Sequence, residues 1–291
     1  MNILLYIEKE FNFLPDIIYH GLMASGHRVV DSPAKPSYHG VNHDPADQGR
    51  SMLCFNFPQH EHQEPYDLIL IDVRYNGPIN YSNFNIIDGN DYQYVRQDLY
   101  DRCHLYFKRE LTQVLLEHYP KCRALPFASL HQEEYIQDKS MPFSFMLSGT
   151  VSTRISYYQA LVNLEHEIQG SIVRYSDNAL YPVNYAEYCE NLRRSKASIS
   201  LKGMGEDTYR YWEIPSYSTV LCARRPEIII PDDFTDTECI RFDNEDDLIN
   251  KLRYYLRDHP GELEQVRRQG YDKLMNYHTS VKRAEYLLRS V

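Results

Sequence analysis

An arginine and a glutamate three residues apart, Arg210 and Glu213, have the types and spacing to bind a charged ligand. They lie in the stretch GEDTYRYWEIPSYSTVLC (205–222), which begins like a helix, and residues three apart on a helix share a face. A carboxylate can accept hydrogen bonds from two ribose hydroxyls, and a guanidinium can bind two oxygens of a diphosphate. The spacing therefore indicates a nucleotide site, and the alternative is an exposed ion pair worth about 0.2–0.5 kcal/mol.

Two glycine-bearing segments precede possible helices and could hold phosphate. Ser148-Gly149-Thr150 stands between a predicted strand and a predicted helix, and Arg154 follows just inside that helix. Free backbone N–H groups and the helix dipole favour an anion there. Gly205 and Glu206 belong to GMGED (203–207), at a strand end where open α/β sheets bind ligands. The alternative for each segment is an ordinary turn.

The first half of the chain offers carboxylates for proton transfer. Asp72 and Asp88 end strands that are predicted to be buried, and Asp91 belongs to the same DGND turn as Asp88. A base that removes the proton of an acceptor hydroxyl can be such a carboxylate. The alternative is a turn or capping role. Lys108, Arg109 and Glu110 form a further charged group, which we interpret as a strand end.

The sequence predicts no metal site. His60 and His62 are two imidazoles at strand spacing, but the nearest further ligands, His43 and Glu64, lie in the same polar loop. A catalytic zinc site needs three well-placed protein ligands, so we interpret these histidines as loop residues.

Composition excludes several classes of protein. The 291 residues carry a net charge of −10, with a pI near 5.6, which argues against a surface that wraps a polyanion. No apolar stretch approaches the ~20 residues that span a bilayer. The six cysteines form no CxxC pair, and the first residues contain no basic leader, so we expect a cytoplasmic protein. The 26 tyrosines are interpreted as half-buried packing residues, although a homodimer interface is an open alternative.

The elements that must position these residues alternate between strand and helix patterns in both halves. Apolar runs such as NILLYI (2–7) and YDLILIDV (66–73) are typical of buried parallel strands. Residues 120–142 hold three prolines with little periodicity, and we expect the crossing between domains there. The predicted domains are 1–125 and 143–275. The second is expected to bind the nucleotide, and the resemblance described below makes the first the domain on the acceptor side. A C-terminal helix at 276–291 is expected, and its crossing back to the first domain is left open.

The order of motifs in the second half resembles GT-B glycosyltransferases. The motifs are the strand–SGT–helix unit with Arg154, then G-x-x-x-x-R-x-x-E-I-P-x-x-S-x-V-L, and finally NEDDLINKLRYYL and YHTSVKRAEYLL. They are most similar to the CgeB-like (spore maturation protein type) branch of group 1, over roughly residues 143–291. The first domain is similar mainly in the order of its elements.

The resemblance implies two Rossmann-like domains whose parallel sheets face each other across a cleft. It also implies transfer of a sugar from a nucleotide-sugar, with no obligatory metal or cofactor. We expect this donor to be a UDP-sugar. By this resemblance Glu213 would hold the ribose, and Arg154 and Arg210 would face the diphosphate. Many relatives have a second acid eight residues before the glutamate, whereas this chain has Gly205 there and Glu206 one place on.

Three functions stay open at this stage. The first is a glycosyltransferase whose acceptor is a glycan, a protein or a modified nucleobase. The second is a GT-B-shaped module that binds a nucleotide or glycan without turnover, suggested by the missing second acid. The third is a nucleotide-sugar epimerase on the same fold.

Overall fold

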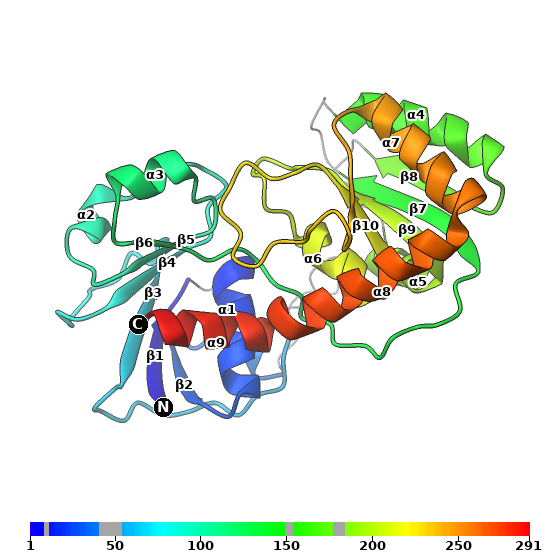
Figure 1. The fold of residues 1–291 in the computed structure, drawn as a ribbon. Coiled ribbons are helices and arrows are strands. Elements are labelled where there is room, and N and C mark those ends of the chain that lie inside the picture. The colour runs from blue at the N-terminus through cyan, green and yellow to red at the C-terminus, as the bar shows by residue number, and fades with distance from the viewer. Residues whose placement is uncertain (9–11, 41–53, 149–153, 177–183) are drawn as a thin grey trace.

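The protein consists of two α/β domains, seen side by side in Figure 1, a ribbon drawing of the computed structural model. The structure describes residues 1–8, 12–40, 54–148, 154–176 and 184–291. Both sheets are parallel throughout their described strands. Parallel strands need crossover connections, and the alternating helix and strand patterns of the sequence supply them.

The first domain is built on a six-stranded sheet with the strand order β2-β1-β3-β4-β5-β6. Its strand β3 is buried at every residue, as expected for an apolar run covered on both faces. The elements are β1 (Asn2–Tyr6), α1 (Phe13–Ala24), β2 (Arg28–Ser32), η1 (Pro36–Tyr38), β3 (Leu68–Asp72), β4 (Asn85–Asp88), α2 (Gln97–Tyr100), β5 (Tyr106–Lys108), α3 (Gln113–His118) and β6 (Cys122–Ala124).

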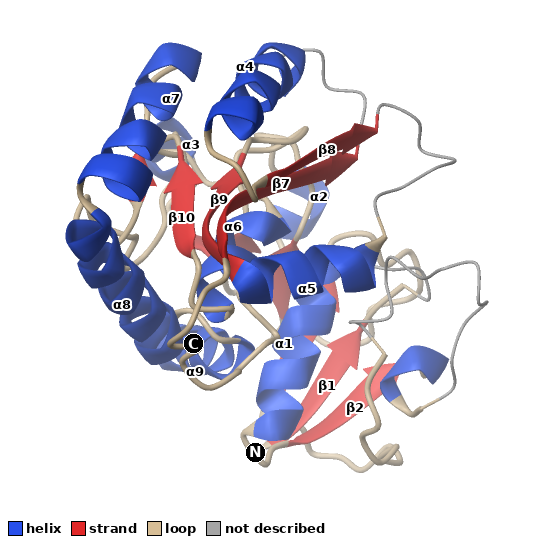
Figure 2. Cartoon of the chain, turned by 90° about the vertical axis from the view of Figure 1, so that its right-hand side faces the viewer, coloured by secondary structure: helices blue, strands red, loops and turns tan. Residues whose placement is uncertain are grey.

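The second domain has a five-stranded sheet with the order β11-β10-β9-β7-β8. In Figure 2, α4 and α7 lie on one side of this sheet and α5 on the other. The elements are β7 (Met141–Ser148), α4 (Arg154–Glu167), β8 (Ile172–Ser176), α5 (Tyr185–Arg194), β9 (Ser195–Ser200), α6 (Tyr209–Ser216), β10 (Val220–Ala223), β11 (Ile240–Arg241), α7 (Glu245–Arg253), the π-helical η3 (Tyr254–Asp258), α8 (Pro260–Tyr277) and α9 (Ser280–Ser290).

One expectation about the crossing between the domains is corrected by the structure. Residues 120–142 were expected to be crossing throughout, but β6 occupies 122–124 and pairs with β5. A strand of three residues beside prolines shows too little alternation to be recognised from the sequence. The connection to the second sheet therefore begins after β6.

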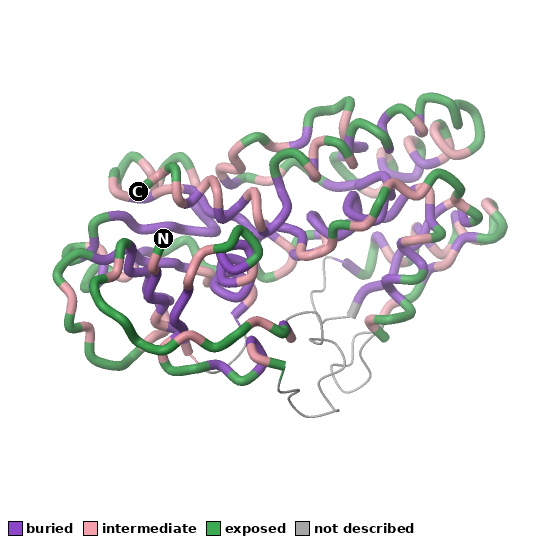
Figure 3. The backbone as a smooth tube through the Cα atoms, turned by 90° about the horizontal axis from the view of Figure 1, so that it is seen from below, coloured by how far each residue is buried: buried purple, intermediate pink, exposed green. Residues whose placement is uncertain are grey.

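The last helix, α9, packs against α1 of the first domain (Figure 1). The two helices approach so closely that a Cβ on Gly21 would lie 2.1 Å from the Ser280 carbonyl oxygen. The His20 ring also makes a 2.8 Å hydrogen bond with the Ser280 hydroxyl. Figure 3 shows buried segments within both domains and exposed residues on the outer loops and helix faces.

Candidate functional site

The carboxyl ends of the two sheets meet at a buried polar contact. Glu110 follows β5 of the first domain, and its carboxylate accepts the backbone N–H groups of Glu206 (2.9 Å) and Asp207 (3.0 Å), which follow β9. Asp207 in turn accepts the backbone N–H of Phe127 at 2.6 Å. These contacts place the strand ends of one sheet against those of the other, where open α/β sheets bind ligands.

Glu213 lies on α6 with its carboxylate facing the protein interior. Its side chain is 3% exposed, so the exposed ion pair considered from the sequence is not formed. The Tyr185 hydroxyl donates to Oε1 of Glu213 at 2.7 Å, and Nε2 of His131 lies 3.9 Å from the same oxygen. Burial raises the pKa of Glu213 to about 7, against the lowering effect of the Tyr185 hydroxyl.

Arg210 brings positive charge near this glutamate, and Arg154 lies near Arg210. Arg154, the first residue of α4, is buried and donates from Nε to the Lys202 carbonyl oxygen at 2.9 Å. Arg210 lies over the Tyr188 ring, 5.4 Å from its centroid, and its buried Nε has no hydrogen-bond partner. Burial lowers the pKa of Arg154 to about 10, and the nearby charge of Arg210 adds to this effect.

Neither arginine has an acidic partner within ion-pair distance among the residues that the structure describes. The carboxylates nearby are engaged elsewhere: Glu206 pairs with Lys202 at 2.9 Å, and Glu213 accepts from Tyr185. Two guanidinium groups close together and partly buried repel each other, which costs stability unless an anion binds between them. The arrangement can bind a diphosphate.

The other residues predicted to bind the donor are placed as follows. Ser148 ends β7, immediately before the described residues stop, and Gly149 and Thr150 lie outside the described residues. Gly205 lies against the first domain, because a Cβ there would be 2.5 Å from Oε1 of Glu110. Glu206 points to Lys202 rather than to Arg210.

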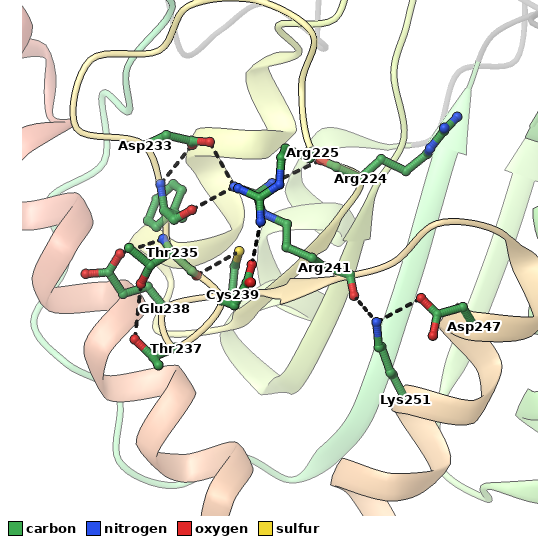
Figure 4. A network of polar contacts seen from close by, with 12 residues as sticks. Arg224, Arg225, Asp233, Thr235, Thr237, Glu238, Cys239, Arg241, Asp247 and Lys251 are labelled. Carbon is green, nitrogen blue, oxygen red and sulfur yellow. Dashed lines mark hydrogen bonds and ion pairs between the residues drawn. The ribbon is translucent and has the colours of Figure 1, made fainter.

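A pocket lies next to this group, at the carboxyl ends of β9 and β10. Lys202, Glu206 and Arg224 are among its lining residues, whereas Arg154, Arg210 and Glu213 are not. The loop after β10 is held by Arg241, which donates to Asp233, to the Phe234 carbonyl and to the Arg224 carbonyl (Figure 4). The pocket is thus an extension of the candidate site and not its centre.

The three candidate bases of the first domain differ in their surroundings. Asp72 is buried, accepts from Nδ2 of Asn12 at 3.0 Å, and has its pKa raised by burial. Asp88 is buried and accepts from Lys108 Nζ at 2.9 Å and from the Tyr106 hydroxyl at 2.7 Å.

Asp91 is the exposed candidate and pairs with Arg109. All three candidates follow or end strands at the carboxyl edge of the first sheet, as the sequence predicted. Nothing in their contacts singles out one of them as the base.

In the described ranges, no group of three or more His, Cys, Asp or Glu side chains is arranged to hold a metal ion. Within those same ranges no helix has the length and apolar character needed to cross a membrane.

Sequence analysis missed two residues that close around Glu213, namely Tyr185 and His131. The tyrosines were interpreted as packing residues, and His131 was not singled out within the crossing between the domains. One available signal was the position of Tyr185 at the start of a helix that follows the strand GSIVRYS, since helix starts face the carboxyl edge of a parallel sheet. His131 offered no such signal.

A comparison with protein families supports the interpretation of the second domain. Residues 154–289 match the family described as glycosyl transferase-like. The match covers α4 to α9 and includes Arg154, Arg210 and Glu213. No curated protein matches the sequence.

Several solved structures share the whole fold at low sequence identity. A glycosyltransferase from Rickettsia africae has a TM-score of 0.59 at 10% identity, with 99% of this chain and 97% of that chain covered. Sucrose-phosphate synthase from Thermosynechococcus elongatus has a TM-score of 0.59 at 9% identity, covering 99% and 98%. A putative UDP-N-acetylglucosamine 2-epimerase from Listeria monocytogenes has a TM-score of 0.52 at 10% identity, covering 99% and 94%. The protein has the GT-B fold, which confirms the predicted fold class.

Proposed function

We propose that this protein is a glycosyltransferase that moves a sugar from a nucleotide-sugar to an acceptor hydroxyl. The glycosyl transferase-like match of the second domain and the GT-B fold support glycosyl transfer in general. The observation that carries the proposal is that Arg154 and Arg210 lie near each other, with Glu213 near Arg210, and that neither arginine has a carboxylate within ion-pair distance among the described residues. Such a group is suited to a nucleoside diphosphate, whose charge the arginines would neutralise.

The donor roles follow from the chemistry of each side chain. Glu213 would accept hydrogen bonds from the ribose hydroxyls, and Arg154 and Arg210 would bind the diphosphate. Ser148, with Gly149 and Thr150, would form the phosphate turn. Gly205 and Glu206 would lie by the sugar. A UDP-sugar is our choice of donor because one structural neighbour is a putative UDP-N-acetylglucosamine 2-epimerase. Membership of the CgeB-like branch is likewise a proposal.

The transfer itself needs a base and a leaving group. The base would take the proton of the acceptor hydroxyl, the oxygen would bond to the anomeric carbon, and the nucleoside diphosphate would leave with the bonding electrons. The arginines would stabilise the charge on the leaving group without an obligatory metal or cofactor. Asp72, Asp88 and Asp91 each stay a candidate for this base, and burial raises the pKa of Asp72 above its ordinary value.

Calorimetry can test the ribose role directly. The wild type and Glu213→Gln would be titrated with UDP and with 2′-deoxy-UDP. We expect the wild type to prefer UDP by about tenfold and the variant to lose that preference, since the ribose hydroxyl would have lost its charged acceptor. Glu190→Gln, which changes an exposed residue of α5, is the control. Equal preferences in wild type and Glu213→Gln would remove the ribose role.

A binding module without turnover is the second candidate. It is favoured by the enclosed Glu213 and by Asp88, whose carboxylate is already bonded to Lys108 and Tyr106. Release of free sugar, or its transfer, by the pure protein with UDP-sugars would dispose of this candidate. Interconversion of two UDP-sugars, followed by NMR, would instead indicate an epimerase.

A further inference from the structure

The carboxylate of Glu213 is closed off in the protein as it stands. Glu213 accepts the Tyr185 hydroxyl at 2.7 Å, and the Tyr185 hydroxyl also lies 2.9 Å from Nε2 of His131. With the Glu213 side chain 3% exposed, a ribose has no access to its oxygens in this arrangement. A ligand that uses this carboxylate must displace a neighbouring group.

The neighbours of Glu213 differ in how readily they could move. Tyr188, Tyr209 and Tyr217 are buried in the hydrophobic core around α6. Tyr185 is the first residue of α5 and only half-buried, and the His131 side chain is 22% exposed. Displacing Tyr185 therefore disturbs less packing than displacing any of the other three tyrosines.

Tyr185 has a second partner available if it leaves Glu213. Burial lowers the pKa of His131 to about 4, so its ring is uncharged at neutral pH and one nitrogen can accept a hydrogen bond. Because the Tyr185 hydroxyl already lies 2.9 Å from Nε2 of His131, it can donate to that nitrogen in the tautomer that carries the proton on Nδ1, once the phenol has moved away from Glu213. The exchange would leave no hydroxyl unsatisfied.

We propose that the Tyr185 hydroxyl occupies the position of a ribose hydroxyl on Glu213, so that Tyr185 competes with the nucleoside diphosphate and sets its affinity. The phenol and the ribose hydroxyl make the same contact, since each donates one hydrogen bond to the carboxylate. On binding, the ribose takes the Glu213 oxygen and Tyr185 turns to His131. This inference rests on the proposed role of Glu213 and adds a residue that determines affinity.

The test is calorimetry of the full chain with UDP and GDP at pH 8.5, where Glu213 is ionised. Tyr185→Phe removes the competing hydroxyl and keeps the ring, so we expect it to bind UDP about two- to tenfold more tightly than the wild type. Tyr158→Phe, a half-buried tyrosine on α4 whose ring packs against Tyr175, is the matched control and should bind like the wild type. Thermal unfolding of each variant checks that the fold is retained.

The outcomes separate this inference from the proposed function. Tighter binding by Tyr185→Phe, or binding by that variant alone, supports competition. Binding by the wild type with equal or weaker binding by Tyr185→Phe overturns it, and the hydroxyl would then be unimportant or a ligand contact. Failure of the wild type and of Tyr185→Phe to bind either nucleotide removes the proposed function, and the inference with it.

Discussion

The carboxyl ends of the two sheets differ in whether their buried cations have acidic partners. In the first domain, the buried cation Lys108 pairs with the buried Asp88 at 2.9 Å. Arg109 lies 3.4 Å from Glu110 and also pairs with Asp91. In the second domain, Arg154 and Arg210 have no carboxylate within ion-pair distance among the described residues.

In our proposal, the paired charges stabilise the fold and the arginines without an acidic partner bind a ligand. A buried ion pair is costly to break because the remaining partner is left charged and desolvated. An unpaired buried cation already carries that cost, so removing it should relieve the folded state and weaken only anion binding. Stability and binding measurements on the two groups should therefore respond in opposite directions.

The largest effect is expected at Lys108. Lys108→Ala leaves Asp88 charged and buried, and we expect the free energy of unfolding to fall by about 3–5 kcal/mol. Chemical denaturation measures this change. Arg225→Ala, which breaks the exposed pair with Asp236, is the control and should cost less than about 1 kcal/mol. A small effect at Lys108 would contradict the view that this domain depends on paired charges.

Removal of the unpaired arginines should weaken binding instead. Arg154→Ala and Arg210→Ala are each expected to reduce affinity for UDP about 10- to 100-fold, because a charged hydrogen bond to phosphate is lost. Their unfolding free energy should stay equal to that of the wild type or rise. A clear fall in the free energy of unfolding with unchanged affinity for UDP would mean that these arginines stabilise the fold and do not bind the ligand.

A smaller effect is expected where the two domains touch. Gly205→Ala would place a Cβ 2.5 Å from Glu110 Oε1, and we expect a loss of about 1–3 kcal/mol in unfolding free energy from the forced shift. Gly261→Ala is the control, since nothing lies within 4 Å of its Cβ position. Equal stability of the two variants would mean that the contact between Glu110 and the 206–207 backbone adapts freely.

The smallest effect concerns pH. Burial raises the pKa of Glu213 to about 7, above its ordinary value, so the folded state holds this proton more tightly than the unfolded state. The contribution to stability is therefore present at low pH and declines as the pH rises towards 7. UDP affinity should change in the other direction, rising several-fold between pH 6 and 8 as Glu213 ionises. Glu213→Gln should show a smaller rise, because only the terminal phosphate of UDP, with a second pKa of about 6, then gains charge.

Much of the fold could be predicted from the sequence because strands buried on both faces leave continuous apolar runs. Residues 66–73 show this for β3. Helices are recognised by a different pattern, apolar residues recurring on one face, and residues 245–253 show that pattern for α7. The strand β6 could not be predicted, since its three residues carry no periodicity and are stabilised by pairing with β5.

The candidate site was predicted in part. Spacing brought Arg210 and Glu213 together on one helix, and the strand–SGT–helix pattern added Arg154, but neither could show that Tyr185 and His131 close off the Glu213 carboxylate. His131 comes from the connection between the domains and lies more than 50 residues from Tyr185 in the sequence. Contacts of that kind carry no local signal.

The sequence by itself determined the residue types at the strand ends, because a residue after a parallel strand always reaches the carboxyl edge of the sheet. Only the tertiary structure decided which of those charges are paired. Pairing depends on packing two sheets so that Glu110 contacts the backbone of 206–207, while no carboxylate of the described residues lies within ion-pair distance of Arg154 or Arg210. Charge is a property of a residue, but its cost depends on what the fold places around it.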